Sequence, residues 1–338
     1  MSSSKPAART YNQEHAKRPY TPGKRRVSIY WTWSYAWESQ RDPAAMENRF
    51  STITEVRNVL WPFYETPQYQ SDMFLQGIAG TLELFHLSAL SFQKVVGEVT
   101  GRPVAVFQRV DQAGYFLPID ERILDDCDTL LVFGLDHLLN GLEVVQGEMD
   151  AINKWLQREG TCLLVAPHHD VGFTDDYDQR QMEYLHHRDA LVPRQQRFTG
   201  YTRSLMKELN IPIINKWGLR PAVDATTKEI MPVKTYRDLD KHGLLKNVTT
   251  FNLHPHLPHY EITKTNGSPI HLLAQQPVDM ERPHPFTAEG NTEFNVLLWM
   301  PPDGNRAGDI LLIDSTHFTT LFGGTDSLEN LWKNIATM

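Results

Sequence analysis

The amino-acid sequence predicts an α/β protein, in which a parallel sheet carries helices on both faces and a β-rich insertion or extension lies toward the C-terminus. The first observation behind this prediction is a strand–helix–strand pattern between about residues 129 and 166. The second is a change of texture at about residue 225, after which short strand-like runs alternate with Pro, Gly and Asn up to about residue 300. The third is the composition, because 41% hydrophobic and 22% charged residues are typical of a soluble globular protein.

The strand–helix–strand pattern is the clearest part of the chain. Residues 129–133 and 161–166 are uninterrupted apolar runs of strand length. Between them, residues 144–159 show helical spacing of apolar side chains, and Gly160 ends this predicted helix. Because continuous apolar strands are typical of parallel sheets covered on both faces, the pattern predicts a βαβ unit.

The other predicted elements follow from local periodicity and from Pro and Gly punctuation. Strands are predicted at 26–33, 103–107, 212–215, 249–253, 260–263, 270–274, 294–300 and 309–314, and helices at 42–60, in part of 77–99, and at 179–187, 199–209 and 327–337. The short connections after about residue 225 predict antiparallel pairing in that region.

The charge distribution divides the chain into a basic arm and an acidic body. Residues 1–26 contain seven Lys or Arg and one Glu, whereas residues 27–338 contain 26 Lys or Arg and 40 Asp or Glu. The arm is predicted to be disordered, and residues 27–338 are predicted to form a single elaborated α/β domain. Because phosphate contacts require clustered cations, an acidic body predicts no nucleic-acid partner. The arm could contact the acidic body of a second copy, so a homo-oligomer is an open alternative.

Cysteine usage and hydropathy indicate the compartment. Two cysteines, Cys127 and Cys162, are too few for a secreted disulfide framework and suit a reducing cytoplasm. No run approaches the ~20 apolar residues that span a bilayer, so neither a membrane anchor nor a membrane partner is predicted.

Polar side chains follow several predicted strands. His168, His169 and Asp170 come after the strand at 161–166, and His317 follows the last strand. Ligands of open parallel sheets bind at the carboxyl ends of the strands, so these four residues are the predicted catalytic residues. Either histidine could act as a base or a metal ligand, Asp170 could orient it, and His317 would face it across a pocket. Because adjacent residues of an extended segment face opposite sides, His168 and Asp170 are the expected pair. The alternative is a polar turn in which Asp170 caps the next segment.

A second group of strand-end residues is predicted to bind substrate. Aromatic residues at the end of the first predicted strand and just beyond it would form a wall for a planar ligand, and polar residues follow this strand and the strand at 129–133. The candidates are Trp31, Trp33, Tyr35, Glu38, Asp136 and His137. Planar ligands stack on such aromatic side chains. The alternative for the tryptophans is burial in the core.

A further histidine cluster lies in the β-rich region. His254 and His256 would share one face of a strand, which is a spacing suited to metal binding. The alternative is a surface loop stiffened by Pro255 and Pro258.

Two segments of the chain resemble a known superfamily. They are DTLLVFG followed by GEMDAINKWLQREGTCLLVAPHHD, and GDILLIDSTHFTTLFGGTDSLENLWKNI near the C-terminus. These segments resemble the class I glutamine amidotransferase-like superfamily, and more narrowly its trehalose-utilisation-protein-like branch. The resemblance covers about residues 27–40, 125–172 and 305–338, and it implies a flavodoxin-like parallel sheet.

The resemblance also shows what this chain lacks. In the superfamily, a cysteine nucleophile occupies the turn after the strand that corresponds to residues 161–166, and here that turn reads Pro167-His168-His169-Asp170. Neither Cys127 nor Cys162 lies at the carboxyl end of a strand, so thiolate catalysis of the family type is not expected. His317 matches the family's histidine in position along the chain only.

The sequence therefore predicts a small-molecule hydrolase or lyase with a His/Asp site. A divalent metal such as Zn, Fe or Mn could generate a hydroxide, which would be the nucleophile in place of the missing cysteine. The superfamily suggests that the substrate bond is C–N, by analogy alone. The alternative is a non-catalytic ligand-binding or assembly domain that has kept the fold and lost the nucleophile.

Overall fold

A computed structural model provides the structure of the chain. It describes residues 22–33, 89–109, 116–136, 138, 141–170, 172–187, 199–251, 256–263, 269–320 and 325–338. The predicted helix at 42–60, most of the predicted arm and the first part of the predicted helix at 77–99 lie outside these residues. No helix in these ranges is long and apolar enough to cross a membrane.

An eight-stranded sheet forms the centre of the molecule, with the strand order β2-β1-β3-β4-β10-β9-β8-β6. Its parallel strands are β1 (Val27–Trp33), β2 (Ala105–Arg109), β3 (Thr129–Leu135), β4 (Cys162–Pro167) and β10 (Asp309–Leu312). Numbered among themselves along the chain, these five strands have the order 2-1-3-4-5, which is the flavodoxin-like order. The predicted fold class is thereby confirmed.

The sheet continues with antiparallel strands from the C-terminal half. They are β9 (Glu293–Met300), β8 (His271–Pro277) and β6 (Lys234–Thr235), which extend the parallel part from β10 outward. Strands of the β-rich region predicted after residue 225 therefore extend the central sheet. The predicted strand at 249–253 is wrong for residues 249–251, because the backbone N–H groups of Thr249 and Thr250 donate to the Ser327 hydroxyl at 2.9 and 3.0 Å instead of to a neighbouring strand.

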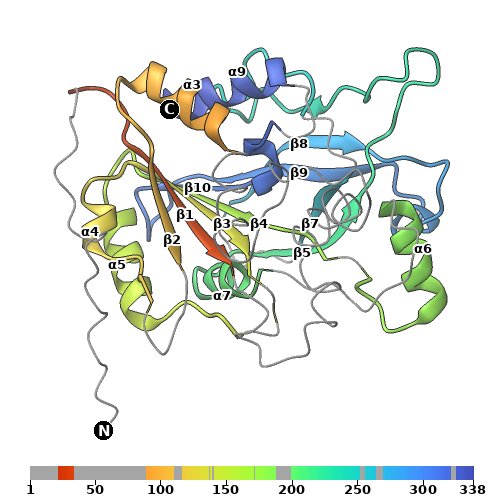
Figure 1. The fold of residues 1–338 in the computed structure, drawn as a ribbon, viewed down its shortest axis with the longest axis horizontal. Helices are drawn as coiled ribbons and strands as arrows, with labels where there is room; N and C mark the ends of the chain where they lie inside the picture. Colours follow the sequence, from red (N-terminus) through yellow and green to blue (C-terminus); the bar gives the residue numbers. More distant parts are fainter. Residues whose placement is uncertain are drawn as a thin grey trace, which may run out of the picture.

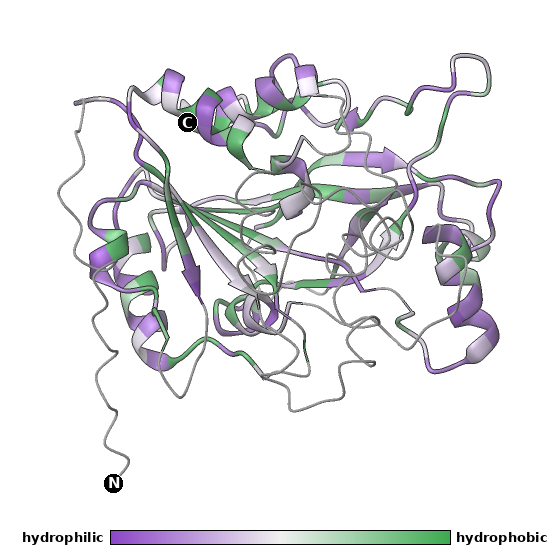
Figure 2. Cartoon of the chain, in the orientation of Figure 1, coloured by the Kyte–Doolittle hydropathy of each residue, from purple (hydrophilic) through white to green (hydrophobic). Residues whose placement is uncertain are grey.

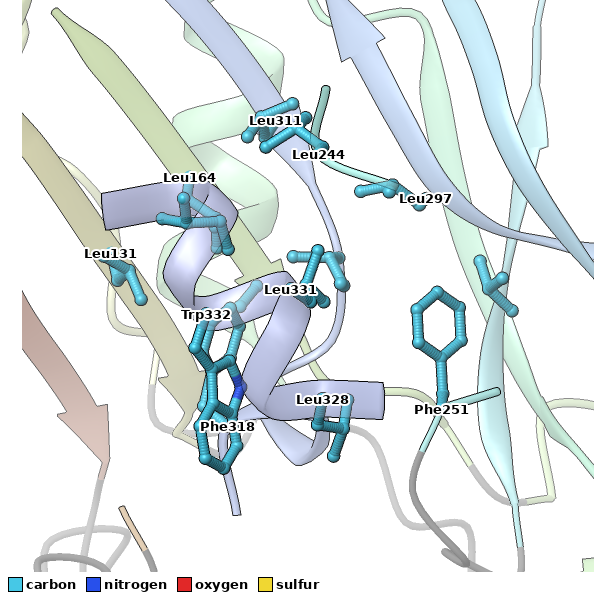
Figure 3. Packing of buried hydrophobic residues seen from close by; sticks show 14 of the residues in the cluster. Leu131, Leu164, Leu244, Phe251, Leu297, Leu311, Phe318, Leu328, Leu331 and Trp332 are labelled. Carbon is cyan, nitrogen blue, oxygen red and sulfur yellow. The ribbon is translucent and has the colours of Figure 1, made fainter. Parts of the chain in front are cut away.

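Helices cover both faces of the sheet (Figure 1). On one face, α3 (Leu90–Thr100) and α9 (Thr325–Ala336) pack together, and Figure 3 shows the side chains of α9 beside Leu131 and Leu164 of the central strands. The other face is covered by α4 (Glu121–Leu124), α5 (Gln146–Leu156) and α7 (Gly200–Glu208). The central strands are predominantly hydrophobic, whereas the helices carry hydrophilic and hydrophobic residues side by side (Figure 2). This pattern is the one expected when a sheet is buried between amphipathic helices.

A small second sheet lies beside the carboxyl end of β4. It consists of β5 (Ile213–Leu219) and β7 (Leu257–Ile262), which pair antiparallel. Two further helices contribute to this region, α6 (Tyr177–His187) and α8 (Pro285–Ala288), and the 3-10 helix η6 (Ser315–Phe318) follows β10.

The end of the predicted basic arm contacts the fold directly. The guanidinium of Arg26 donates to both carboxylate oxygens of Asp128, at 2.9 and 2.6 Å. Arg25 donates to the Thr129 hydroxyl and to the backbone oxygen of Gly160. These two arginines therefore anchor the beginning of β1 to the beginning of β3.

Candidate functional site

The segment after β4 is held between the central sheet and the small sheet. The backbone N–H of Asp170 donates to the oxygen of Lys216 at 2.8 Å, and the N–H of Gly218 donates back to the Asp170 oxygen at 3.3 Å. Closer to β4, the side-chain amide of Asn215 on β5 donates to the backbone oxygen of His168 at 2.6 Å. These bonds fix the two histidines where the parallel strand ends, which is where ligands bind in this class of sheet.

Three histidines from three different elements meet at this point. They are His169 from the turn after β4, His187 from the end of α6 and His256 immediately before β7, and we call them the facing histidines. One ring nitrogen from each lies within 4.8 Å of the others. His169 Nε2 is 2.9 Å from His187 Nε2, and the rings of His187 and His256 are stacked with their centroids 3.5 Å apart. Three imidazole nitrogens in this arrangement are a typical ligand set for zinc.

The ring of His169 lies against a glycine. A Cβ atom added to Gly218 would be 2.2 Å from His169 Cδ2 and 2.6 Å from its Nε2. No side chain fits at that distance, so the absence of a Cβ on β5 creates the space in which the His169 ring lies.

A histidine–carboxylate pair adjoins the facing histidines. His168 Nδ1 is 3.4 Å from Asp314 Oδ1, and the His168 and His169 rings are 4.1 Å apart. The hydroxyls of Ser315 and Thr316 donate to the two Asp314 carboxylate oxygens, at 3.2 and 2.7 Å. Burial alone would raise the pKa of Asp314, but the charge and contact of His168 hold that pKa below its ordinary value. Asp314 is therefore an ionised group that orients the His168 ring.

The pairing within the turn differs from the sequence prediction. His168 and His169 share one cluster, because β4 ends at Pro167 and the alternation of an extended strand does not continue into the turn. Asp170 was expected to orient His168, but its carboxylate contacts the Arg203 guanidinium at 2.9 Å, and Asp314 approaches His168 instead.

His317 lies beyond Asp314 in a hydrophobic environment. Its Nδ1 is 3.2 Å from the backbone oxygen of Asp314, and its ring packs edge-on against Phe251. Burial lowers the pKa of His317 to about 4, so the ring is neutral at physiological pH. The metal-ligating groups formed by the described residues do not include it.

Two of the predicted substrate-binding residues, Trp31 and Asp136, have described side chains, and both are buried in the fold. Trp31 is buried and its ring packs edge-on against Phe133, which is the core alternative. Asp136 is fully buried and accepts hydrogen bonds from the Thr32 hydroxyl and the Tyr201 N–H, both at 2.9 Å, so it connects α7 to β3. The Trp33 side chain and the residues Tyr35, Glu38, His137 and His254 lie outside the described residues, and their roles stay predictions.

Two residues of the site had no predicted role. His187 lies at the end of a helix that the sequence did predict, and the signal that could have identified it is a second His-His pair, His186-His187. Asp314 is the last residue of the strand predicted at 309–314, so its position at a strand end is the available signal.

Three other buried histidines lie close by and differ in their bonding. His186, His259 and His284 each accept a hydrogen bond from a backbone N–H, at 3.0, 3.2 and 3.0 Å respectively, and we call them the backbone-bonded histidines. Burial lowers their pKa values to about 4, about 4 and about 2 respectively. They are neutral hydrogen-bond acceptors of the fold.

Comparison with known proteins adds similarity of structure alone. No family model and no curated protein matches the chain. Among solved structures, one described as "mmIFT52 N-terminal domain" is similar, with 12% sequence identity, a TM-score of 0.41, and coverage of 72% of this chain and 85% of that chain.

Proposed function

We propose that this protein is a metal-dependent hydrolase that acts on a small molecule. One observation carries the proposal: three facing imidazoles lie next to a histidine–carboxylate pair at the carboxyl ends of β4 and β10. The first set has the composition of a metal site, and the second has the composition of a proton-transfer pair.

The facing histidines would hold the metal. Three neutral nitrogen donors suit zinc best, and also suit iron. A divalent ion bound by three histidines activates a coordinated water near neutral pH. The His168–Asp314 pair would move the proton: the ionised carboxylate fixes the ring through Nδ1, which leaves Nε2 as the nitrogen to accept or deliver a proton at the substrate.

The bond that is cleaved is proposed to be C–N. Support comes from the resemblance to the amidotransferase-like superfamily and its trehalose-utilisation-protein-like branch, because His168 stands in the turn that carries the family's cysteine. Cys162 is fully buried at the beginning of β4, where burial raises the pKa of its thiol to about 12. It cannot form a thiolate at neutral pH, so a metal-activated water takes the place of the thiolate nucleophile in this proposal.

The first experiment is elemental analysis of the purified full-length protein grown with zinc, iron and manganese, together with His256→Ala. His271→Ala is the matched control, because His271 lies on β8 and is not one of the facing histidines. We expect near-stoichiometric metal in the wild type and the control, and its loss in His256→Ala. Absence of metal from the wild type would overturn the proposal.

The second experiment tests the reaction. Wild-type protein and Asp314→Asn would be incubated with a panel of small amides, ureas and amidines, and release of ammonia or amine would be measured. We expect turnover by the wild type and a roughly 10²–10⁴-fold lower rate for Asp314→Asn with its metal retained, since the proton-transfer pair is uncoupled. Equal rates for the two proteins would remove His168–Asp314 from the mechanism.

Deep burial favours a second candidate, which is a non-catalytic domain with a structural metal. The facing histidines His169, His187 and His256 are only 0%, 6% and 3% exposed. Structural zinc sites are closed by four protein ligands, whereas catalytic sites keep one position for water. Substitution with Co²⁺ distinguishes the two: a visible spectrum that changes on addition of azide shows an exchangeable position, and one that does not change favours the structural role.

A further inference from the structure

A cavity of about 400 Å³ lies between α7 and β5, outside the group of facing histidines. Its walls are formed mainly by Met206, Ile211 and Ile213, which are buried, and by Arg203, Lys207 and Asn215. A volume of a few hundred Å³ with apolar walls and a small number of polar groups is typical of small-molecule sites.

The charged groups of the cavity have one sign. Arg203 and Lys207 line it, and none of the described residues that line it is acidic. Arg203 uses Nε for the Thr199 hydroxyl and Nη2 for Asp170, so Nη1 has no contact within the described part of the chain. Lys207 is exposed. In a chain of net charge −8, two cations next to an apolar wall form a local environment that favours an anion.

Asn215 adds a hydrogen-bonding group at the inner wall. The residue is 2% exposed, and its Nδ2 donates to the His168 oxygen. Its Oδ1 is buried and accepts no hydrogen bond from the described residues. A buried acceptor without a hydrogen bond is unfavourable, so a ligand that donates a hydrogen bond to Oδ1 would gain from this arrangement.

We propose that this cavity binds a small carboxylate with a short apolar chain. The carboxylate would pair with Lys207 and with the Nη1 edge of Arg203, and the chain would lie on Ile211, Ile213 and Met206. The cavity walls are also bonded to both neighbours of His169, through Asn215 to His168 and through Arg203 to Asp170. The inference rests on the proposed function in one respect, because it assigns the substrate of the metal site to the class of small apolar carboxylates.

The test uses isothermal titration of the full-length protein with hexanoate, with hexanol as the uncharged probe of equal chain length. Two variants address the two halves of the cavity: Lys207→Gln removes an exposed cation, and Ile214→Trp places an indole at a lining position that is 42% exposed. Lys246→Gln is the matched control, because it removes an exposed lysine elsewhere on the surface. Metal content is measured in parallel for every protein.

We expect hexanoate to bind about tenfold more tightly than hexanol, which corresponds to about 1.4 kcal/mol. Lys207→Gln should weaken hexanoate binding by about tenfold, Ile214→Trp should abolish it, and the control should bind like the wild type. Equal binding of the two probes, or hexanoate binding that survives in Ile214→Trp, would overturn the inference. If metal is present and hexanoate does not bind, this inference alone fails. If hexanoate binds as expected and metal is absent, the cavity assignment stands and the proposed function fails.

Discussion

Two groups of three buried histidines lie near one another in this protein, and their ring nitrogens are used differently. The facing histidines turn ring nitrogens toward one another, with 2.9 Å between Nε2 atoms of His169 and His187. The backbone-bonded histidines turn a ring nitrogen toward a peptide N–H. The last turn of α6 contributes to both groups, since His187 belongs to the first and His186 to the second.

Proximity of histidines alone does not define a metal site. His186 accepts from the Arg220 N–H through Nε2, and its Nδ1 is 3.2 Å from the Arg282 oxygen, so both nitrogens serve the backbone. A metal ligand needs a lone pair that is directed at the ion, and a nitrogen that accepts a peptide hydrogen bond has none to offer. The direction of the ring nitrogens, and not the number of histidines, separates the two groups.

His186 and His187 are neighbours on α6, and replacing each of them by alanine separates the two roles. His187→Ala removes one of three metal ligands, and we expect metal affinity to fall by about 100-fold or more. His186→Ala removes two hydrogen bonds to the backbone, so it should destabilise the fold by roughly 1–3 kcal/mol and leave the metal content unchanged. Elemental analysis and urea denaturation of both variants measure the two effects. Equal loss of metal in both would show that the two groups form one site.

Acidification should destabilise the folded protein through the buried neutral histidines. The backbone-bonded histidines and His317 have pKa values well below the ordinary 6.5, because their burial penalises the charged ring. The unfolded chain therefore binds more protons than the folded one below about pH 6.5, and stability falls as pH decreases from 6.5 toward 4. At pH 5 each of the four rings is about 1.5 pH units below the unfolded pKa of 6.5, so at about 1.4 kcal/mol per unit these groups together should lower the stability by roughly 8 kcal/mol relative to pH 7.5.

The measurement is urea denaturation at pH 7.5, 6.0 and 5.0 on protein treated with a chelator, so that loss of metal does not contribute. His284→Gln keeps a polar side chain without a titratable ring, and it should reduce the pH dependence. A stability that is constant between pH 7.5 and 5.0 would contradict the assignment of these histidines as neutral buried groups.

A backbone substitution tests whether the facing arrangement depends on the glycine behind it. Gly218→Ala places a Cβ 2.2 Å from His169 Cδ2, so the ring must move away from His187 and His256. We expect metal affinity to fall by about tenfold and stability by roughly 1–3 kcal/mol. Gly147→Ala is the control, because its Cβ would meet nothing within 4 Å in α5, and it should be neutral or slightly stabilising. Unchanged metal affinity in Gly218→Ala would show that His169 is not held in place by β5.

The fold could be predicted from the sequence where periodicity is strong. The βαβ unit is predicted at residues 129–166 because two uninterrupted apolar runs of strand length flank a segment with helical spacing, and such strands are typical of parallel sheets. The antiparallel strands after residue 225 were predicted from their spacing. The segment at 249–251 was not predicted correctly, because β-branched residues resemble a strand locally, while the Ser327 hydroxyl on α9 takes up their N–H groups, and α9 is distant in the sequence.

The site could be predicted only in parts. His168-His169 and His254/His256 were separate hypotheses in the sequence, and the structure brings His169 and His256 together with a centroid distance of 4.5 Å. No local pattern shows that the turn after β4 meets the segment before β7, since this contact depends on the small sheet of β5 and β7. His187 is missing from the prediction for the same reason, because the direction of a helix end is set by tertiary packing.

Glu183 lies one turn before His187 on α6, and it is a buried carboxyl group. Burial raises the pKa of Glu183 to about 7, although its carboxylate accepts a hydrogen bond from the Phe173 N–H at 2.6 Å. A raised folded-state pKa contributes stability that is fully present below the unfolded value of about 4.5 and is lost as pH rises through 7. Glu183→Gln keeps an acceptor for Phe173 and cannot ionise, so it should stabilise the protein by roughly 1–3 kcal/mol at pH 8.5 and have little effect at pH 5. Urea denaturation at the two pH values, with the exposed Glu159→Gln as control, checks this sign. A stabilisation that is equal at both pH values would show that Glu183 does not titrate near neutrality, and the pH dependence of α6 would then come from its histidines alone.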